Sequence, residues 1–341
     1  MESGDAAVID STEAKQAARR PTLLERWRAA PPAYRYGTFL ALVPYVVIMG
    51  LTTGNRPEQF AIVGSAVGLS LWSDATRAFF KSVIALLVFG VIYDLTHLTE
   101  PLVRYLHVHI AEPYNFDKAY FAIASATGAL TPNEYFALHH WPWVDFITGL
   151  AYILFVYWAF AFVIYLGIFR RKDAAMQTLL LQYGWVFCAV NLVGFATYYL
   201  YPAAPPWYAA QYGFGPAHFE VAASPAAAIR WDELTGLHYF AGFYGRSADI
   251  FGAIPSLHVA YPLLVFVYGR HVEKLSLNIA NFLFYLLVCF SAVYLQHHYV
   301  LDVIIGSAYA LVGYAVERGW TRYRTQRRQQ SAGPDVKLTS V

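Results

Sequence analysis

The chain has 341 residues, of which 58% are hydrophobic and 18% aromatic, while only 13% are charged and the formal net charge is +2. Soluble domains carry about 25% charged residues, so this composition excludes an ordinary soluble domain and predicts an integral membrane protein. Each of the two cysteines, Cys188 and Cys289, lies inside an apolar run, which excludes a disulfide framework and a cysteine-based metal site.

The N-terminal segment, residues 1–35, is polar and then basic. It has no apolar run of the kind that forms the core of a signal peptide. We expect its first half to be disordered and the part from Leu23 to Trp27 to lie along the membrane surface. The segment is therefore predicted to be cytoplasmic.

Eight apolar runs follow, and a helical crossing of a bilayer needs about 20 residues. The runs are Tyr36–Thr53, Phe60–Trp72, Phe79–Leu95, Val144–Phe169, Met176–Leu200, Ile254–Gly269, Leu277–Leu295 and Tyr299–Val316. The second run is short, so a half-span is also possible there.

The distribution of Lys and Arg decides between seven and eight crossings. With eight crossings and both termini cytoplasmic, 19 cations lie on the inner side and 5 on the outer side. Seven crossings would place the six N-terminal cations outside, against the positive-inside rule.

The sequence thus predicts an all-α polytopic membrane protein, a helical bundle of about eight transmembrane segments. Its catalytic domain would span 36–317, and a basic cytoplasmic tail would follow at 318–341. We interpret the tail arginines as a topological anchor rather than a nucleic-acid site.

Two long segments, Thr96–Trp143 and Tyr201–Ala253, fall on the outer side in this arrangement. Both are rich in Tyr, Trp, Phe, Pro and His, as suits segments in the headgroup region. We expect them to cover the site and to select the substrate. The outer side itself is the periplasm, the cell exterior or the Golgi lumen.

Two histidine pairs in the first outer segment raise the question of a metal. His107 and His109 alternate, and His139 precedes His140, but no cysteine or carboxylate cluster accompanies either pair in the sequence. We therefore predict no metal site there.

The stretch 252–302 carries the chemistry. His258 and His298 lie at opposite ends of an apolar hairpin, so two crossings would return both to one membrane surface. His298 and Asp302 are four residues apart, which on a helix places their Cβ atoms about 5–6 Å apart. A carboxylate there orients an imidazole and raises its basicity. We predict His298 as the nucleophile, Asp302 as its orienting partner, and His258 as the acid for the leaving group and then the base for the acceptor.

Other interpretations of these residues remain open. Polar groups could simply anchor helix ends at the interface, but an Asp at a helix centre costs about 2.5–3.5 kcal/mol, which favours a functional site. A metal held by the same three side chains is a second alternative, although the two-histidine chemistry needs none. His297 would point about 100° away from His298 on a helix, so we expect it behind the site or at the interface.

Further residues are expected to bind the phosphate. Pro255 and Ser256 precede a helix whose N-terminal N–H groups favour an anion, so Ser256 and this backbone are candidates. Arg246 lies twelve residues before His258 and is the candidate basic clamp, with Asp249 as a partner. An ordinary solvated loop charge is the alternative for Arg246.

These motifs resemble those of the type 2 phosphatidic acid phosphatase superfamily. Pro255-Ser256-Leu257-His258 is similar to the second signature, with Leu where many members have Gly. Ser291, His298 and Asp302 fit the third signature, with Ala292 where Arg is usual, and the first signature, Lys-x6-Arg-Pro, is missing. In its place stands YYLYPAAPPWY, residues 198–208, which with FGAIPSLH and HHYVLD resembles the inositol phosphorylceramide synthase branch. The resemblance implies a six-helix phosphatase-like core and substrate contacts from Tyr201 and Trp207.

The predicted reaction is phosphoryl transfer through a phosphohistidine, without a cofactor. The resemblance implies transfer of phosphoinositol from phosphatidylinositol to a ceramide-like or other lipid hydroxyl. With water as the acceptor, the same residues make a phosphatase for a polyprenyl or diacylglycerol phosphate. The missing Lys-x6-Arg-Pro favours transfer, because a phosphodiester monoanion needs fewer cations than a monoester dianion. A lipid transporter or other non-enzymatic membrane module is the alternative from another class, and the His/His/Asp set argues against it. The sequence predicts no nucleic-acid partner and leaves the oligomeric state open.

Overall fold

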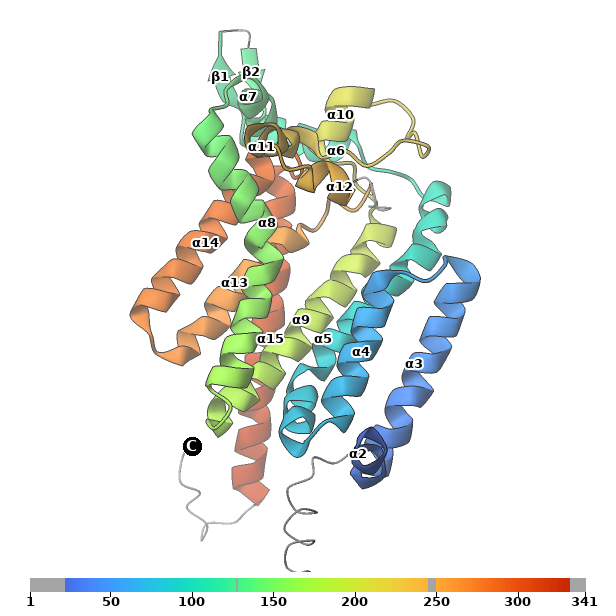
Figure 1. Cartoon of the computed structure of the whole chain (residues 1–341). Helices are drawn as coiled ribbons and strands as arrows, with labels where there is room; N and C mark the ends of the chain where they lie inside the picture. The colour runs from blue at the N-terminus through green and yellow to red at the C-terminus, as the bar shows by residue number, and fades with distance from the viewer. Residues whose placement is uncertain (1–21, 127, 245–249, 332–341) are drawn as a thin grey trace, which may run out of the picture. The chain divides into compact units, whose positions relative to one another are not determined.

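A computed structural model describes residues 22–126, 128–244 and 250–331 (Figure 1). The chain divides into two compact units, Met1–Lys81 and Ser82–Val341, which we call the N-terminal and C-terminal units. Helix α5 (Asp74–Thr99) runs from one unit into the other. Each unit is described by itself.

The described part of the N-terminal unit consists of helices. They are α2 (Leu23–Ala29), α3 (Pro32–Thr52), α4 (Pro57–Leu71) and the first residues of α5. Thr22 and Glu25 close a capping box at the start of α2. Arg26 then lies over the Trp72 ring at 4.3 Å and donates to the Trp72 carbonyl, which ties α2 to the residue after α4.

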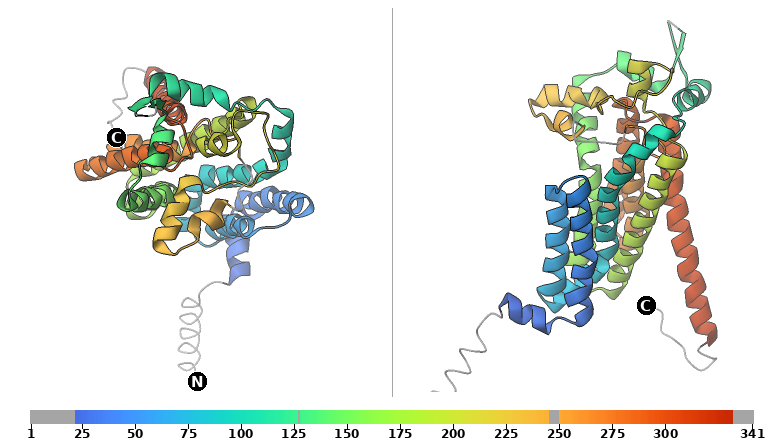
Figure 2. Two further views of the ribbon diagram at one scale, coloured as in Figure 1. Left: turned by 90° about the horizontal axis from the view of Figure 1, so that it is seen from above. Right: turned by 90° about the vertical axis from the view of Figure 1, so that its right-hand side faces the viewer.

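The C-terminal unit is built from long apolar helices. After α5 come α8 (Pro142–Ile164), continued by a π-helical turn at Tyr165–Phe169, then α9 (Ala174–Leu200), α13 (Leu257–Gly269), α14 (Leu275–Tyr294) and α15 (Val300–Ser331). Helix α13 packs against α8, α9, α14 and α15, and eleven of its thirteen residues are buried. Helix α15 runs on past its neighbours (Figure 2), so the predicted tail at 318–341 begins inside a continuous helix.

Six helices in the described residues are long and apolar enough to cross a membrane, which confirms a multi-pass, all-α membrane protein. They correspond to six of the eight apolar runs predicted from the sequence. The other two form shorter helices, α4 with 15 residues and α13 with 13. At 1.5 Å per residue these are about 22 and 20 Å long, short of the roughly 30 Å hydrocarbon core. The count of eight crossings therefore stays a prediction.

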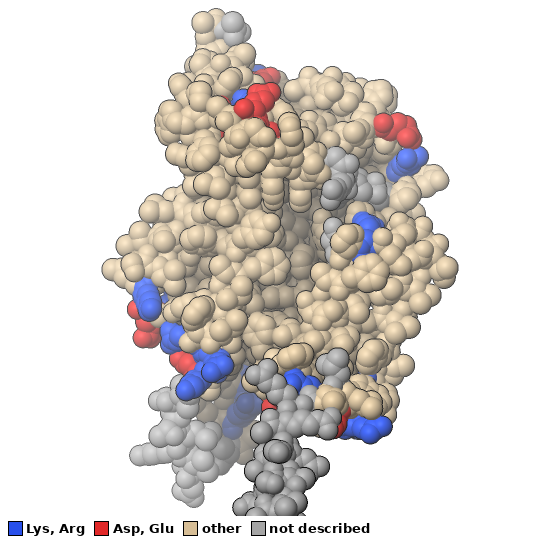
Figure 3. Space-filling model, in the orientation of Figure 1, with Lys and Arg blue, Asp and Glu red and all other residues tan. Residues whose placement is uncertain are grey.

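The two predicted outer segments lie together at one end of the C-terminal unit (Figure 1). The first contains η1 (Glu100–Tyr105), α6 (Ala111–Tyr120), α7 (Pro132–Leu138), and a hairpin of β1 (Ile123–Ser125) and β2 (Gly128–Leu130) that pairs Ile123 with Leu130. The second contains α10 (Pro206–Tyr212), η3 (Ala226–Ala228), α11 (Ile229–Thr235) and α12 (Tyr239–Tyr244). The α8–α9 and α13–α14 turns, with their Arg and Lys residues, lie at the opposite end (Figures 1 and 3).

Backbone pairing joins the two outer segments. His109 donates its N–H to the Pro202 carbonyl at 2.8 Å, and its own carbonyl accepts from Ala204 at 2.9 Å. Ala203 in turn bonds the stretch at Phe251 and Ala253, just before α13. This small parallel arrangement sets the position of the Ala253 carbonyl.

Candidate active site

His298 and Asp302 meet where α14 gives way to α15. Nδ1 of His298 lies 3.3 Å from Oδ2 of Asp302 and 3.0 Å from the Ala253 carbonyl. The same Oδ2 accepts the Tyr299 N–H at 2.9 Å, so the fully buried Asp302 also caps the start of α15. Because both neighbours of Nδ1 are acceptors, Nδ1 carries the proton and Nε2 of His298 is unprotonated.

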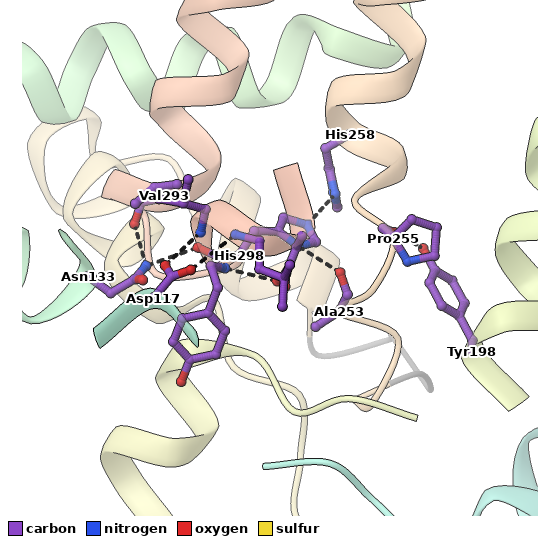
Figure 4. Close-up of polar contacts among 12 residues, drawn as sticks. Asp117, Asn133, Tyr198, Ala253, Pro255, His258, Val293 and His298 are labelled. Carbon is purple, nitrogen blue, oxygen red and sulfur yellow. Dashed lines mark hydrogen bonds and ion pairs between the residues drawn. The ribbon is translucent and has the colours of Figure 1, made fainter. Parts of the chain in front are cut away.

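His258, in the first turn of α13, faces this unprotonated nitrogen. Its Nδ1 lies 2.9 Å from Nε2 of His298, and hydrogen-bond logic makes His258 the donor. Figure 4 shows the two imidazoles approaching each other from separate helices. The structure thus brings together His258, His298 and Asp302, the three residues that the sequence assigned to catalysis.

The start of α13 is pressed against the start of α15. The Ser256 N–H donates to the Asp302 carbonyl at 3.1 Å. A Cβ on Gly306 would collide with the Ser256 carbonyl, so only glycine allows this approach. The contact holds both histidine motifs at one level.

The first outer segment braces the His298 turn (Figure 4). Nδ2 of the buried Asn133 donates to the Val293 carbonyl at 2.9 Å and the His298 carbonyl at 3.0 Å, and Gln296 donates back to the Asn133 carbonyl at 2.7 Å. Sequence analysis missed Asn133, since nothing in its neighbourhood indicates so distant a contact.

Asp117 on α6 is a second residue near the site that the sequence did not predict. Its fully buried carboxylate accepts N–H groups from Val300 at 2.8 Å and Leu301 at 3.1 Å, the first residues of α15. Burial raises the pKa of Asp117 to about 6, against the opposing effect of these two bonds. A buried carboxylate thus fixes the helix that carries Asp302.

A stack of four rings covers the other side of the site. Tyr152 lies nearly parallel to both His258 (4.5 Å between centroids, 15° between planes) and His297 (5.2 Å, 6°), and Tyr244 lies nearly parallel to His297 (4.6 Å, 8°). Phe155 also contacts His258, at 4.6 Å. The rings come from α8, α12, α13 and the His298 turn, which the stack ties together.

The predicted phosphate-binding residues have mixed positions. Ser256 is fully buried, and its Oγ has no hydrogen-bond partner within the described residues. The Pro255 carbonyl accepts the Tyr198 hydroxyl at 3.1 Å. Arg246 and Asp249 lie outside the described residues.

The two aromatic residues expected to contact substrate also make contacts within the protein, and their contact with substrate stays a prediction. Tyr201 stacks on His109, with ring centroids 3.7 Å apart. Trp207 is buried in an apolar cluster with Tyr208 and Phe251, and its N–H donates to the Gln296 carbonyl at 3.2 Å. Trp207 therefore reaches the His298 turn through its backbone.

One other cluster offers metal ligands. The sequence suggested that no carboxylate accompanies His107 and His109, but the first turn of α6 brings Glu112 to both. Its Oε1 lies 2.9 Å from His109 Nδ1 and 3.8 Å from His107 Nε2. Imidazole and carboxylate are ligands for Zn²⁺, so these three groups could hold a divalent cation.

Comparison with known proteins places the site in a wider context. The sequence model of the PAP2 superfamily matches residues 129–316, which include both histidine motifs. The phosphoinositol dihydroceramide synthase of Bacteroides thetaiotaomicron is 32% identical over 279 residues, 79% of this chain and 87% of that protein.

Two yeast proteins are similar over a shorter region. The catalytic subunit of inositol phosphorylceramide synthase is 34% identical in Schizosaccharomyces pombe and 36% in Saccharomyces cerevisiae, over 129 residues each. These matches cover 37% and 36% of this chain and 30% of either relative. No solved structure matches the chain.

Proposed function

The chain belongs to the PAP2 superfamily, and from this premise we propose that it is a membrane lipid phosphotransferase. It would move phosphoinositol, or a similar phospho-headgroup, from a phospholipid to a hydroxyl of a lipid such as ceramide. The observation that carries the proposal is the unprotonated Nε2 of His298, which accepts a hydrogen bond from His258 Nδ1 at 2.9 Å while the opposite nitrogen is held by Asp302 and Ala253. The relatives named for transfer to ceramides support the substrate class.

The proposed reaction has two steps. The substrate phosphorus enters between the two imidazoles, and Nε2 of His298 attacks it while the bond to the diacylglycerol oxygen breaks. His258, in its imidazolium form, donates a proton to that oxygen and becomes neutral. In the second step, His258 takes the proton from the acceptor hydroxyl, whose oxygen attacks the phosphohistidine and releases His298. Asp302 keeps the proton on Nδ1 and stabilises the positive charge on His298.

The charge on the phosphoryl oxygens needs a cation. Three outer cations of the C-terminal unit are described, and each is bound to a carboxylate: Arg104 to Glu220, Lys118 to Glu134, and Arg230 to Asp145. None of these contacts involves the two imidazoles. This pairing supports Arg246 as the phosphate clamp, together with the unpartnered Ser256 Oγ.

Burial favours transfer over hydrolysis. His298 is 4% exposed and Asp302 is fully buried. A site that excludes water protects a phosphohistidine until a lipid hydroxyl arrives. Hydrolysis of a lipid phosphate would use the same residues with water as the acceptor.

Product analysis tests the proposal. Purified protein is incubated with phosphatidylinositol, with and without ceramide, beside His298→Ala and the exposed control His139→Ala. We expect diacylglycerol and the phosphoinositol-bearing ceramide from the wild type and the control, and neither product from His298→Ala. Release of free inositol phosphate at the same rate with and without ceramide would instead identify a hydrolase.

We also propose that the site faces the outer side of the membrane. The distribution of 19 inner and 5 outer cations supports this orientation. Single cysteines at Tyr120 and Tyr212 should react with an impermeant reagent added outside, and one at Lys172 should not. Labelling of residue 172 from outside would reverse the orientation.

A further inference from the structure

His297 is a buried histidine that the proposed reaction does not use. It neighbours the proposed nucleophile, is 5% exposed, and its ring contacts the rings of Tyr152 and Tyr244. Its Nε2 is buried and has no hydrogen-bond partner in the part of the chain that the structure describes. A buried polar atom without a partner is costly, so it indicates a missing ligand group.

The other ring nitrogen defines what that ligand must be. The Pro225 carbonyl accepts a hydrogen bond from the His297 ring, and since Nε2 has no partner the donor is Nδ1. Nε2 then carries only a lone pair. Burial lowers the pKa of His297 to about 3, and the neighbouring His298 contributes, so the ring is neutral at pH 7. The missing ligand group must therefore donate a hydrogen bond.

The stack places this acceptor next to the reacting groups. Tyr152 contacts the imidazoles of both His258 and His297, with ring centroids 4.5 and 5.2 Å away. A molecule held between His258 and His298 would thus have its neighbouring atoms near His297. Both substrates of the proposed reaction carry hydroxyls close to the transferred phosphorus: the cyclitol of the donor, and the sphingoid hydroxyls of the acceptor.

We propose that His297 Nε2 accepts a hydrogen bond from a substrate hydroxyl, so that His297 is a specificity-determining residue for hydroxyl-rich lipids. This inference rests on the proposed function. A site built to accept a hydroxyl discriminates strongly against an analogue that lacks it, because the buried nitrogen is then left unpaired. The ring contacts with Tyr152 and Tyr244 and the hydrogen bond to Pro225 fix the ring and so the direction of the lone pair.

The test uses His297→Phe, which keeps a flat ring in contact with the two tyrosines but removes the acceptor. The matched control is His139→Phe, because His139 also stacks on a tyrosine, Tyr135, but is exposed. Each protein is assayed with phosphatidylinositol and its single-deoxy cyclitol analogues, and with ceramide and acceptors that lack one hydroxyl. Activity of the wild type and the control verifies the proposed function independently of His297.

We expect His297→Phe to raise the KM for one of the two substrates by about 10- to 100-fold. The wild type should show the same loss when the responsible hydroxyl is removed, and the variant should lose nothing further with that analogue. The substrate whose analogue abolishes the difference identifies the source of the hydroxyl. The proposal is wrong if the effects of His297→Phe and of the missing hydroxyl on KM multiply for every analogue of both substrates. It is also wrong if His297→Phe has the KM values of the wild type.

A second measurement leaves residue 297 unchanged. In ¹⁵N-histidine-labelled His298→Ala protein, which cannot turn over, the His297 Nε2 resonance should shift when phosphatidylinositol or ceramide is added. A shift with only one lipid again identifies the source. No shift with either lipid overturns the proposal, even if His297→Phe fails to fold.

Discussion

The two site histidines are held in different ways. The His298 turn is fixed by hydrogen bonds from separate parts of the chain, with Asn133 and Asp117 on one side and Ala253 on the other. His258 is held by the helix that carries it and by the rings of Tyr152 and Phe155, and its one described side-chain hydrogen bond is to His298. In the proposed reaction, hydrogen bonds fix the group that attacks phosphorus along one line, while packing suffices for the group that passes a proton between two oxygens.

The largest effect should come from removing the reacting groups themselves. His298→Ala, His258→Ala and Asp302→Ala should each lower the rate by about ten-thousand-fold or more, and the double variant His258→Ala/His298→Ala should be little worse than either single one. His297→Ala should retain part of the activity. Rates of product formation provide the measurement, and near-normal turnover by His298→Ala would remove the basis of the mechanism.

Removing the proposed phosphate clamp, Arg246, should have the next largest effect. Arg246→Ala should lower kcat by about 100- to 1,000-fold, as expected for a donor to the transition-state oxygens. Arg246→Lys should lose most of the same benefit, since a lysine cannot make a bidentate contact. If Arg246→Ala keeps half the wild-type rate at saturating substrate, Arg104 becomes the next cation to test.

A pair of variants tests whether the His298 turn depends on hydrogen bonds and His258 on packing. Asn133→Ala removes two hydrogen bonds to the His298 turn, so it should cost about 1–3 kcal/mol of unfolding free energy and lower kcat by up to about 100-fold. Phe155→Leu, beside His258, keeps an apolar side chain and should cost less than about 1.5 kcal/mol with little change in kcat. Equal loss of kcat in both variants would abolish the distinction between the two sides.

The smallest effect concerns pH and Asp117. Its pKa is raised from 3.8 to about 6 in the folded protein, so the folded state binds the proton more tightly than the unfolded state. Unfolding free energy should therefore fall as pH rises from about 4 to 6, by at most about 3 kcal/mol from this group. Asp117→Asn should lack that part of the slope. Thermal unfolding in detergent at pH 4, 5, 6 and 7 measures it, and parallel curves would contradict the assignment.

Local spacing was enough to predict that His258, His298 and Asp302 come together. The interval of four between His298 and Asp302 and the apolar hairpin that returns to His258 follow from the geometry of one helix and one pair of helices. The long apolar runs likewise predicted six helices of spanning length. Their ends were less certain, and the run at Ile254–Gly269 became a helix only from Leu257.

The bracing residues could not be predicted in this way. Asn133 and Asp117 contact residues more than 150 positions away in sequence, and no periodic pattern connects an outer segment to a turn between two helices. Those long-range contacts are set by tertiary packing. Glu112 was missed for a different reason, since its contact with His109 spans three residues and depends on where α6 begins.

Gly306 has a consequence for how sequences of this kind can diverge. Its bare Cα lets the carbonyl of Ser256 touch α15, so the backbones of the two histidine motifs meet with no side chain between them. A single added methyl group would separate the motifs and lengthen the 2.9 Å contact between His258 and His298. The two histidine motifs therefore require glycine at position 306. A saturation library at residue 306 should return glycine alone among active clones.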